Sequence, residues 1–179
     1  TIHIIVTNNE IIFVIGDYDV DGCVSTALLM NFLNQINNSN FYYIPNRFKD
    51  GYGSSIKLIK KIITKKPNLI IFVDNGSNSN ETINFLKKNK IKSIIIDHHD
   101  IYNPVPKSDI LINPKKNCEY SNYNYLCAAT LTYFFIDTYI DKFQLNIKFS
   151  KNLHLVLLAI ISDVMPLRKI NRIIANNVL

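Results

Sequence analysis

Short apolar runs alternate along this chain with longer segments in which apolar residues recur at helical spacing. The runs EIIFVIGDYD (10–19), NLIIFVDNG (68–76) and IKSIIIDHH (91–99) are continuous, which is typical of strands buried on both faces. Two shorter runs, residues 41–46 and 109–114, predict two further strands. The segments with helical spacing are residues 23–36, 54–63, 78–89, 125–140 and 150–164.

Because strands and helices alternate with short connections, the chain predicts an α/β fold, with a mainly parallel sheet and helices on both faces. A length of 179 residues suits one domain or one and a half, and a hydrophobic content of 47% is typical of a globular protein. The chain starts at Thr1 and ends in IIANNVL without a closing element. We therefore expect it to be a piece of a longer protein.

The bulk composition sets broad limits on function. The formal net charge of +6 favours a polyanionic partner such as nucleic acid, but an AT-rich genome, which enriches Lys, Asn and Ile together, explains the charge alone more simply. Three cysteines without C-x-x-C spacing predict a reducing compartment, and we expect a cytoplasmic protein. No segment reaches the roughly 18 apolar residues that a membrane span needs, and none resembles a signal peptide.

Acidic residues and histidines follow the predicted strands at the points where the strands end. They are Asp17 and Asp19 at the end of the run at 10–19 and Asp21 just after it, Asp74 in the run at 68–76, and Asp97, His98 and His99 in the run at 91–99. The carboxyl ends of parallel strands meet at one edge of the sheet, where ligands bind in open α/β folds. Asp163, at the end of an apolar helical segment, is expected to join them.

Such a cluster of carboxylates repels itself unless cations neutralise it. Carboxylate oxygens with one or two imidazoles suit Mn²⁺ or Mg²⁺, and two such ions about 4 Å apart are a common device for hydrolysing phosphoesters. Each motif alone has a simpler explanation: Asp74 as a turn former, the histidine pair as a surface feature, and DYDVDG as a calcium-binding turn, although no Glu follows at the EF-hand spacing. Their expected meeting at one edge favours the metal site.

Four motifs, DYDVDG, VDNG, DHHD and SDVMPL, occur in the order typical of DHH-family phosphoesterases, and the chain resembles that family over nearly its whole length. The segment PNRFKDGYG (45–53), and Asn171 and Arg172 after SDVMPL, are similar to the RecJ branch of single-strand-specific 5′→3′ exonucleases. The resemblance implies a metal-dependent phosphodiesterase that degrades single-stranded DNA in DNA repair and recombination. It also implies a DHH catalytic domain over residues 1–179, with the second DHH-associated domain and the OB-fold of such enzymes outside this chain.

The resemblance further implies a site for two Mn²⁺ or Mg²⁺ ions. Its implied ligands are Asp17, Asp19, Asp21, Asp74, His98 and Asp163. Asp74 is the expected bridge between the ions, and Asp97 is expected to orient a histidine through a hydrogen bond.

Other residues are implied to contact the substrate. His99 would contact the scissile phosphate or stabilise developing charge. Arg47 is a candidate phosphate clamp because a guanidinium binds phosphate bidentately, and Gly51 and Gly53 would let the backbone approach the strand closely. Single-stranded DNA is the implied partner, and a single-stranded-DNA-binding protein is a candidate second one. Ser54 departs from the Leu usual in relatives after GYG. The stretch LCAATLTYFF (126–135) lacks the glycine usual in relatives before the fourth motif, which bears on helix packing and close approach of nucleic acid there, and not on the metal site.

Two other functions fit parts of the sequence. One is a phosphodiesterase of the same superfamily that acts on short oligonucleotides or cyclic dinucleotides, and PNRFKDGYG argues against it. The other is a catalytically inactive DHH protein that serves as a structural replication factor. Every expected ligand position is filled, which ranks that second alternative lower.

Overall fold

The computed structural model describes residues 2–37, 39–48, 54–116 and 122–179. Its centre is a five-stranded sheet in the order β2-β1-β3-β4-β5, and every neighbouring pair of strands is parallel. The strands are β1 (Ile12–Ile15), β2 (Asn40–Tyr43), β3 (Leu69–Val73), β4 (Lys92–Ile96) and β5 (Ile110–Ile112). The prediction of an α/β fold built on a parallel sheet is confirmed.

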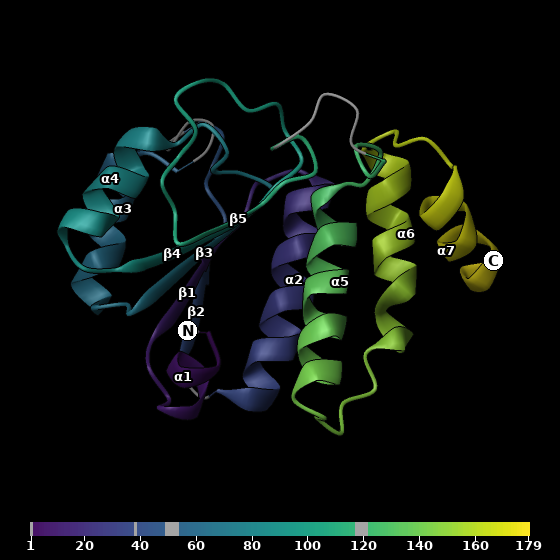
Figure 1. The fold of residues 1–179 in the computed structure, drawn as a ribbon, viewed down its shortest axis with the longest axis horizontal. Helices are drawn as coiled ribbons and strands as arrows, with labels where there is room; N and C mark the ends of the chain where they lie inside the picture. Colours follow the sequence, from purple (N-terminus) through teal and green to yellow (C-terminus); the bar gives the residue numbers. More distant parts are fainter. Residues whose placement is uncertain (1, 38, 49–53, 117–121) are drawn as a thin grey trace.

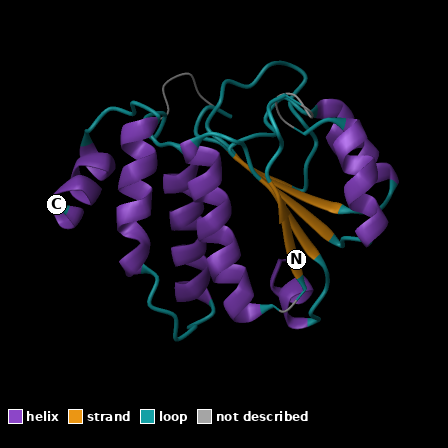
Figure 2. Ribbon diagram, turned by 180° about the vertical axis from the view of Figure 1, so that it is seen from behind, coloured by secondary structure: helices purple, strands orange, loops and turns teal. Residues whose placement is uncertain are grey.

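Helices cover both faces of this sheet. They are α1 (Ile2–Thr7), α2 (Val20–Ile36), α3 (Ile56–Ile62), α4 (Asn80–Lys88), α5 (Ala128–Lys142), α6 (Leu153–Ser162) and α7 (Lys169–Val178), with short 3₁₀ helices at Ile63–Lys65 and Ser150–Asn152. One face carries α3 and α4, and the other carries α2, α5 and α6 (Figures 1 and 2). The last helix, α7, packs on α6 at the outer side of that second layer. Within the described ranges, no helix is both long and apolar enough to cross a membrane.

Strand β1 shows why a continuous apolar run suits this architecture. All four of its residues are buried. Ile12 and Val14 belong to the core beneath α2, α5 and α6, whereas Phe13 and Ile15 belong to the core beneath α3 and α4. Because successive side chains of a strand point to opposite faces, one apolar run supplies both cores.

The two ends of the chain differ from the expectation. Residues Ile2–Thr7 form α1, and Ile5 and Val6 are buried in the larger core. No helix was expected after residue 164, but Lys169–Val178 form α7, which buries Asn171, Ile174 and Ala175. Helix α1 has only six residues, too few for a helical period in the sequence, so its packing on the core determines it. Helix α7 does carry such a period, since Ile170, Ile173, Ile174 and Val178 recur at helical spacing.

Candidate metal centre

The carboxyl ends of three neighbouring strands bring the predicted acidic residues and histidines together. Asp17, Asp19 and Asp21 follow β1, Asp74 follows β3, and Asp97, His98 and His99 follow β4. Asp163 arrives from the C-terminal cap of α6. The sheet order places β1, β3 and β4 side by side, which brings their carboxyl ends together. Asp163 joins them through His98, whose Nε2 lies 3.6 Å from Asp163 Oδ2.

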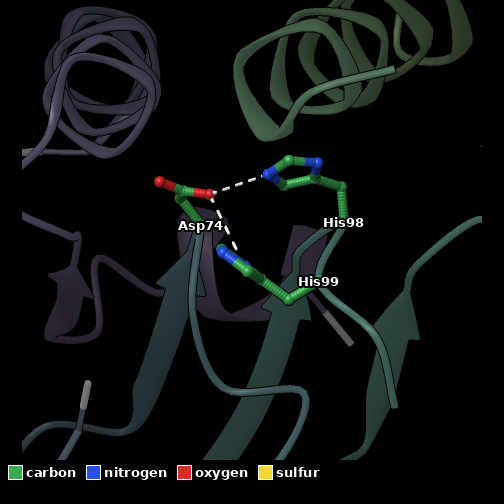
Figure 3. A group of neighbouring side chains, drawn as sticks. All are labelled: Asp74, His98 and His99. Atoms are coloured by element: carbon green, nitrogen blue, oxygen red, sulfur yellow. Dashed lines mark ion pairs between the residues drawn. The ribbon is translucent and has the colours of Figure 1, made fainter. Parts of the chain in front are cut away.

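Asp74 lies at the centre of this group (Figure 3). Its side chain is fully buried, and within the described part of the chain neither carboxylate oxygen has a hydrogen-bond partner. One oxygen, Oδ1, lies 3.4 Å from His98 Nε2 and 3.9 Å from His99 Nδ1. Burial, and next the charges of Asp21 and Asp19, raise the pKa of Asp74 well above its ordinary value. A buried carboxylate without partners is costly, so the environment of Asp74 fits a cation-binding role.

His98 is the second centre of contacts. Besides Asp74, its Nε2 lies 3.6 Å from Asp21 Oδ2 and 3.6 Å from Asp163 Oδ2. These distances are longer than good hydrogen bonds, so the oxygens surround the nitrogen without bonding to it. Asp163 Oδ2 also lacks a hydrogen-bond partner in the described ranges, and burial raises the pKa of Asp163 against the opposing effect of His98.

Asp21 has a different environment, although it is as deeply buried as Asp74. Its Oδ2 accepts a hydrogen bond from the backbone N–H of Ala128, and its Oδ1 accepts one from Ala129, both at 2.8 Å. These are the first two residues of α5, whose N-cap residue Cys127 makes no side-chain capping bond. Asp21 therefore caps α5 from α2, and the positive end of the helix dipole stabilises its charge.

Asp97 is held by several donors. Its Oδ1 lies 2.8 Å from His99 Nδ1 and accepts the backbone N–H of His98 at 2.8 Å, and its Oδ2 accepts the backbone N–H of Ser77 at 3.0 Å. Burial raises the pKa of Asp97, but the hydrogen bonds from His99 and Ser77 outweigh it and leave the pKa below its ordinary value. The same bond raises the pKa of His99, with burial opposing it. This position suits the predicted orienting role, which stays a prediction.

The first motif folds into a tight turn at the start of α2. Asp17 is buried, its Oδ1 accepts the backbone N–H of Tyr18 at 2.8 Å, and burial raises its pKa. Asp19 is exposed and caps α2 by accepting the backbone N–H of Gly22 at 2.8 Å. A Cβ at Gly22 would lie 2.6 Å from backbone atoms of Asp17, so this turn requires glycine.

The predicted substrate contacts are described only in part. Arg47 is exposed in the turn that follows β2, and its guanidinium carbon lies 5.6 Å from the centre of the Tyr18 ring. This cation–π contact places Arg47 beside the first motif. Gly51 and Gly53 lie outside the described residues.

Two asparagines, not expected from the sequence, support the site. Asn75 donates from Nδ2 to the carbonyl oxygens of Ile15 (3.1 Å) and Val73 (2.9 Å), and so joins the ends of β1 and β3. Asn113 donates from Nδ2 to the carbonyl oxygen of His99 at 2.9 Å. Their sequence signal was weak, because a lone asparagine after a strand is an ordinary turn residue.

The donor atoms fit divalent cations. Three sets of side chains have ligand atoms within 4.8 Å of one another: Asp74 with His98 and His99, Asp21 with His98 and Asp163, and Asp17 with Asp19 and Asp74. Carboxylate oxygens with a minority of imidazole nitrogens suit Mn²⁺ or Mg²⁺. Asp74 and His98 each belong to two of the three sets, and Asp74 offers two carboxylate oxygens without a hydrogen-bond partner in the described ranges.

Comparison with known proteins gives consistent matches. The family model described as "DHH family, N-terminal domain" matches residues 11–160. The single-stranded-DNA-specific exonuclease RecJ of Haemophilus influenzae is 35% identical over 92% of this chain, and that of Escherichia coli is 33% identical over 91%. The chain spans only 30% of the length of each of these two relatives.

Solved structures share the fold. A crystal structure of exonuclease RecJ bound to manganese matches 94% of this chain with a TM-score of 0.84 and 24% identity, and the chain covers 42% of it. The structure of RecJ from Thermus thermophilus in complex with Mn²⁺ matches 96% of this chain with a TM-score of 0.80 and 21% identity, and the chain covers 24% of it.

Proposed function

The chain belongs to the DHH family, and from this premise we propose that it forms the catalytic domain of a RecJ-like exonuclease that degrades single-stranded DNA in the 5′→3′ direction. The observation that carries the proposal is Asp74, a fully buried carboxylate without a hydrogen-bond partner in the described ranges, with two imidazoles facing it. Similarity to the RecJ exonucleases of Haemophilus influenzae and Escherichia coli supports the choice of substrate. Residues 1–179 would act as one unit within a longer enzyme.

We assign two divalent ions, Mn²⁺ or Mg²⁺, to the carboxyl edge of the sheet. The proposed ligands are Asp17, Asp19, Asp21, Asp74, His98 and Asp163. When bound, such a pair lowers the pKa of a water molecule and neutralises charge on the phosphate oxygens. Asp74 is the proposed bridge because both of its oxygens are free of other partners among the described residues. Asp21 uses one lone pair of each oxygen to cap α5, so it would bind through the remaining ones and keep its orientation.

His99 would stabilise charge on the scissile phosphate. Asp97 holds His99 Nδ1 at 2.8 Å, which fixes the ring, and Nε2 would face a phosphate oxygen. The raised pKa of His99 favours the protonated ring, whose Nε2–H donates a charge-assisted hydrogen bond. Arg47 is unpaired with any acidic group in the described ranges and would bind a neighbouring phosphate. Association with a single-stranded-DNA-binding protein stays a prediction of the resemblance.

The test is a nuclease assay on the intact protein with Mn²⁺, Mg²⁺ or a chelator. Strands labelled at the 5′ or the 3′ end report polarity, duplex DNA reports strand preference, and dinucleotides and cyclic dinucleotides test the alternative substrates. We expect Mn²⁺-dependent release of mononucleotides from single strands, lost in Asp74→Ala and kept in Asp109→Ala, whose carboxylate pairs with Lys92 at the other end of the sheet. Absence of release from the intact protein, or unchanged release by Asp74→Ala, would refute the proposal.

A further inference from the structure

Phe48 has 95% of its surface exposed to solvent in the turn that follows β2. A single exposed apolar residue is common on protein surfaces and by itself has no meaning. The position of Phe48 is what singles it out, because it directly follows Arg47, the basic residue that packs against the first motif along this edge of the sheet.

The sheet order explains how the turn that holds Phe48 comes to lie near the first motif. Strand β2 is the neighbour of β1, and the backbone N–H of Gly16 donates to the carbonyl oxygen of Tyr43, so the loops that leave the two strands run together. Arg47 then packs over the ring of Tyr18, which stands between two proposed metal ligands in the sequence.

The turn that presents the ring has its own hydrogen bond. The backbone N–H of Phe48 donates to Asn46 Oδ1 at 3.0 Å, which fixes the direction of the backbone just after β2. An aromatic ring is thereby presented to solvent, next to a guanidinium that is free of acidic partners in the described ranges. A flat apolar face beside a cation matches the chemistry of a nucleotide, which offers a base and a phosphate.

We propose that Phe48 stacks on a base of the bound single strand while Arg47 binds an adjoining phosphate. This inference rests on the proposed function and adds a contact to the base, which the metal centre does not supply. Bases of a single strand expose their faces, and an aromatic side chain binds any of them without reading sequence. The contact would hold the strand on the β2 side of the metal centre and would affect binding more than the chemical step.

The experiment compares Phe48→Leu and Phe48→Trp with Phe134→Leu, which removes a half-exposed ring from α5. Binding of a fluorescent single-stranded oligodeoxynucleotide is measured with Ca²⁺ in place of Mn²⁺, and turnover is measured with Mn²⁺. A second series of strands carries one abasic nucleotide at each of the positions near the 5′ end. Thermal unfolding of each variant reports folding, which the exposed Phe48 should hardly affect.

We expect Phe48→Leu to weaken binding and raise KM about tenfold with little change in kcat, and Phe48→Trp to bind as the unchanged protein does. One abasic position should weaken binding by the unchanged protein but not by Phe48→Leu, and that position identifies the stacked base. Phe134→Leu should bind normally.

Equal binding by Phe48→Leu and the unchanged protein, in a protein that binds and cleaves single strands, would overturn this inference and leave the proposed function intact. The inference would also be overturned if Phe48→Leu weakened binding to every abasic strand as much as it weakens binding to the intact strand. The Phe48 ring would then contribute to binding without stacking on any one base. If the unchanged protein neither binds nor cleaves single strands, the proposed function fails, and the stacking proposal fails with it.

Discussion

Two aspartates at opposite ends of the sheet, Asp109 and Asp74, have opposite environments. At the amino end, Lys92 Nζ lies 2.9 Å from Asp109 Oδ1, and the two side chains are 53% and 37% exposed. At the carboxyl end, Asp74 is fully buried and has no hydrogen-bond partner in the described ranges. An exposed ion pair contributes little stability, whereas a buried carboxylate without partners costs stability. The carboxyl end therefore bears a cost that a bound cation would offset, and function is expected there.

Asp74→Asn should give the largest effect, because it replaces the buried, unpartnered carboxylate at the carboxyl end of the sheet with a neutral amide. We expect nuclease activity to be lost, while the metal-free variant becomes more stable by about 1–3 kcal/mol, since a neutral amide replaces an unpaired carboxylate. Chemical denaturation in the presence of a chelator measures the free energy of unfolding. If the metal-free variant were less stable than the unchanged protein, the buried carboxylate of Asp74 would not be destabilising the fold.

Substitutions of the two adjacent histidines should have different effects, one on metal affinity and the other on the catalytic rate. His99→Ala should lower kcat by roughly 10²–10³-fold and spare Mn²⁺ affinity, because its Nδ1 is held by Asp97 and its ring is proposed to face the phosphate. His98→Ala should weaken Mn²⁺ binding, because three carboxylates surround its Nε2. Calorimetry and steady-state kinetics on both variants make the comparison. An equal loss of metal in both variants would refute this division of roles.

The stability of the metal-free protein should depend on pH through Asp74. Its pKa is raised in the folded state above the ordinary 3.8, so above that pH the folded protein holds a proton that the unfolded chain releases. Stability should therefore fall as pH rises, by up to about 1.4 kcal/mol per pH unit.

Unfolding between pH 5 and pH 8 in a chelator measures this slope. The slope should be smaller in Asp74→Asn, and Mn²⁺ should reduce it in the unchanged protein because metal binding displaces the proton. A slope unaffected by the substitution would assign the pH dependence to other groups.

The smallest effect is expected at the amino end of the sheet. Lys92→Ala should change the free energy of unfolding by less than about 1 kcal/mol, because water screens the exposed pair. Asp109→Ala should cost more, because Asp109 Oδ2 also accepts the backbone N–H of Ser93 at 2.9 Å. Nuclease activity should stay unchanged in both variants. A double-mutant cycle gives the coupling energy, and a coupling of several kcal/mol would remove the contrast between the two ends.

The sequence predicted which residues meet at the carboxyl end of the sheet. It did not predict the hydrogen-bond partners of each residue there. Buried runs such as Ile12–Ile15 are local signals, and the rules for parallel sheets bring the residues that follow them to one edge. The partner of Asp21 had no such signal, because the backbone N–H of Ala128 lies 107 positions away and almost any residue would supply it. The contrast between Asp21 and Asp74, two buried aspartates at one edge, became visible only in three dimensions.

Phe48 illustrates the same limit on the substrate side. The motif that contains Arg47 was recognised from its residues, but the exposure of the next ring depends on how the turn after β2 leaves the sheet. Helix α7 was likewise missed, although its signal was local: Ile170, Ile173, Ile174 and Val178 recur at helical spacing in Lys169–Val178.

We expect Asp74 to bind metal at the carboxyl end of the sheet. Calorimetric titration of Mn²⁺ into the metal-free protein, into Asp74→Asn and into Asp109→Asn tests it directly. We predict two bound ions in the unchanged protein and in Asp109→Asn, and the loss of at least one in Asp74→Asn. The same number of ions bound with the same affinity in all three proteins would contradict it.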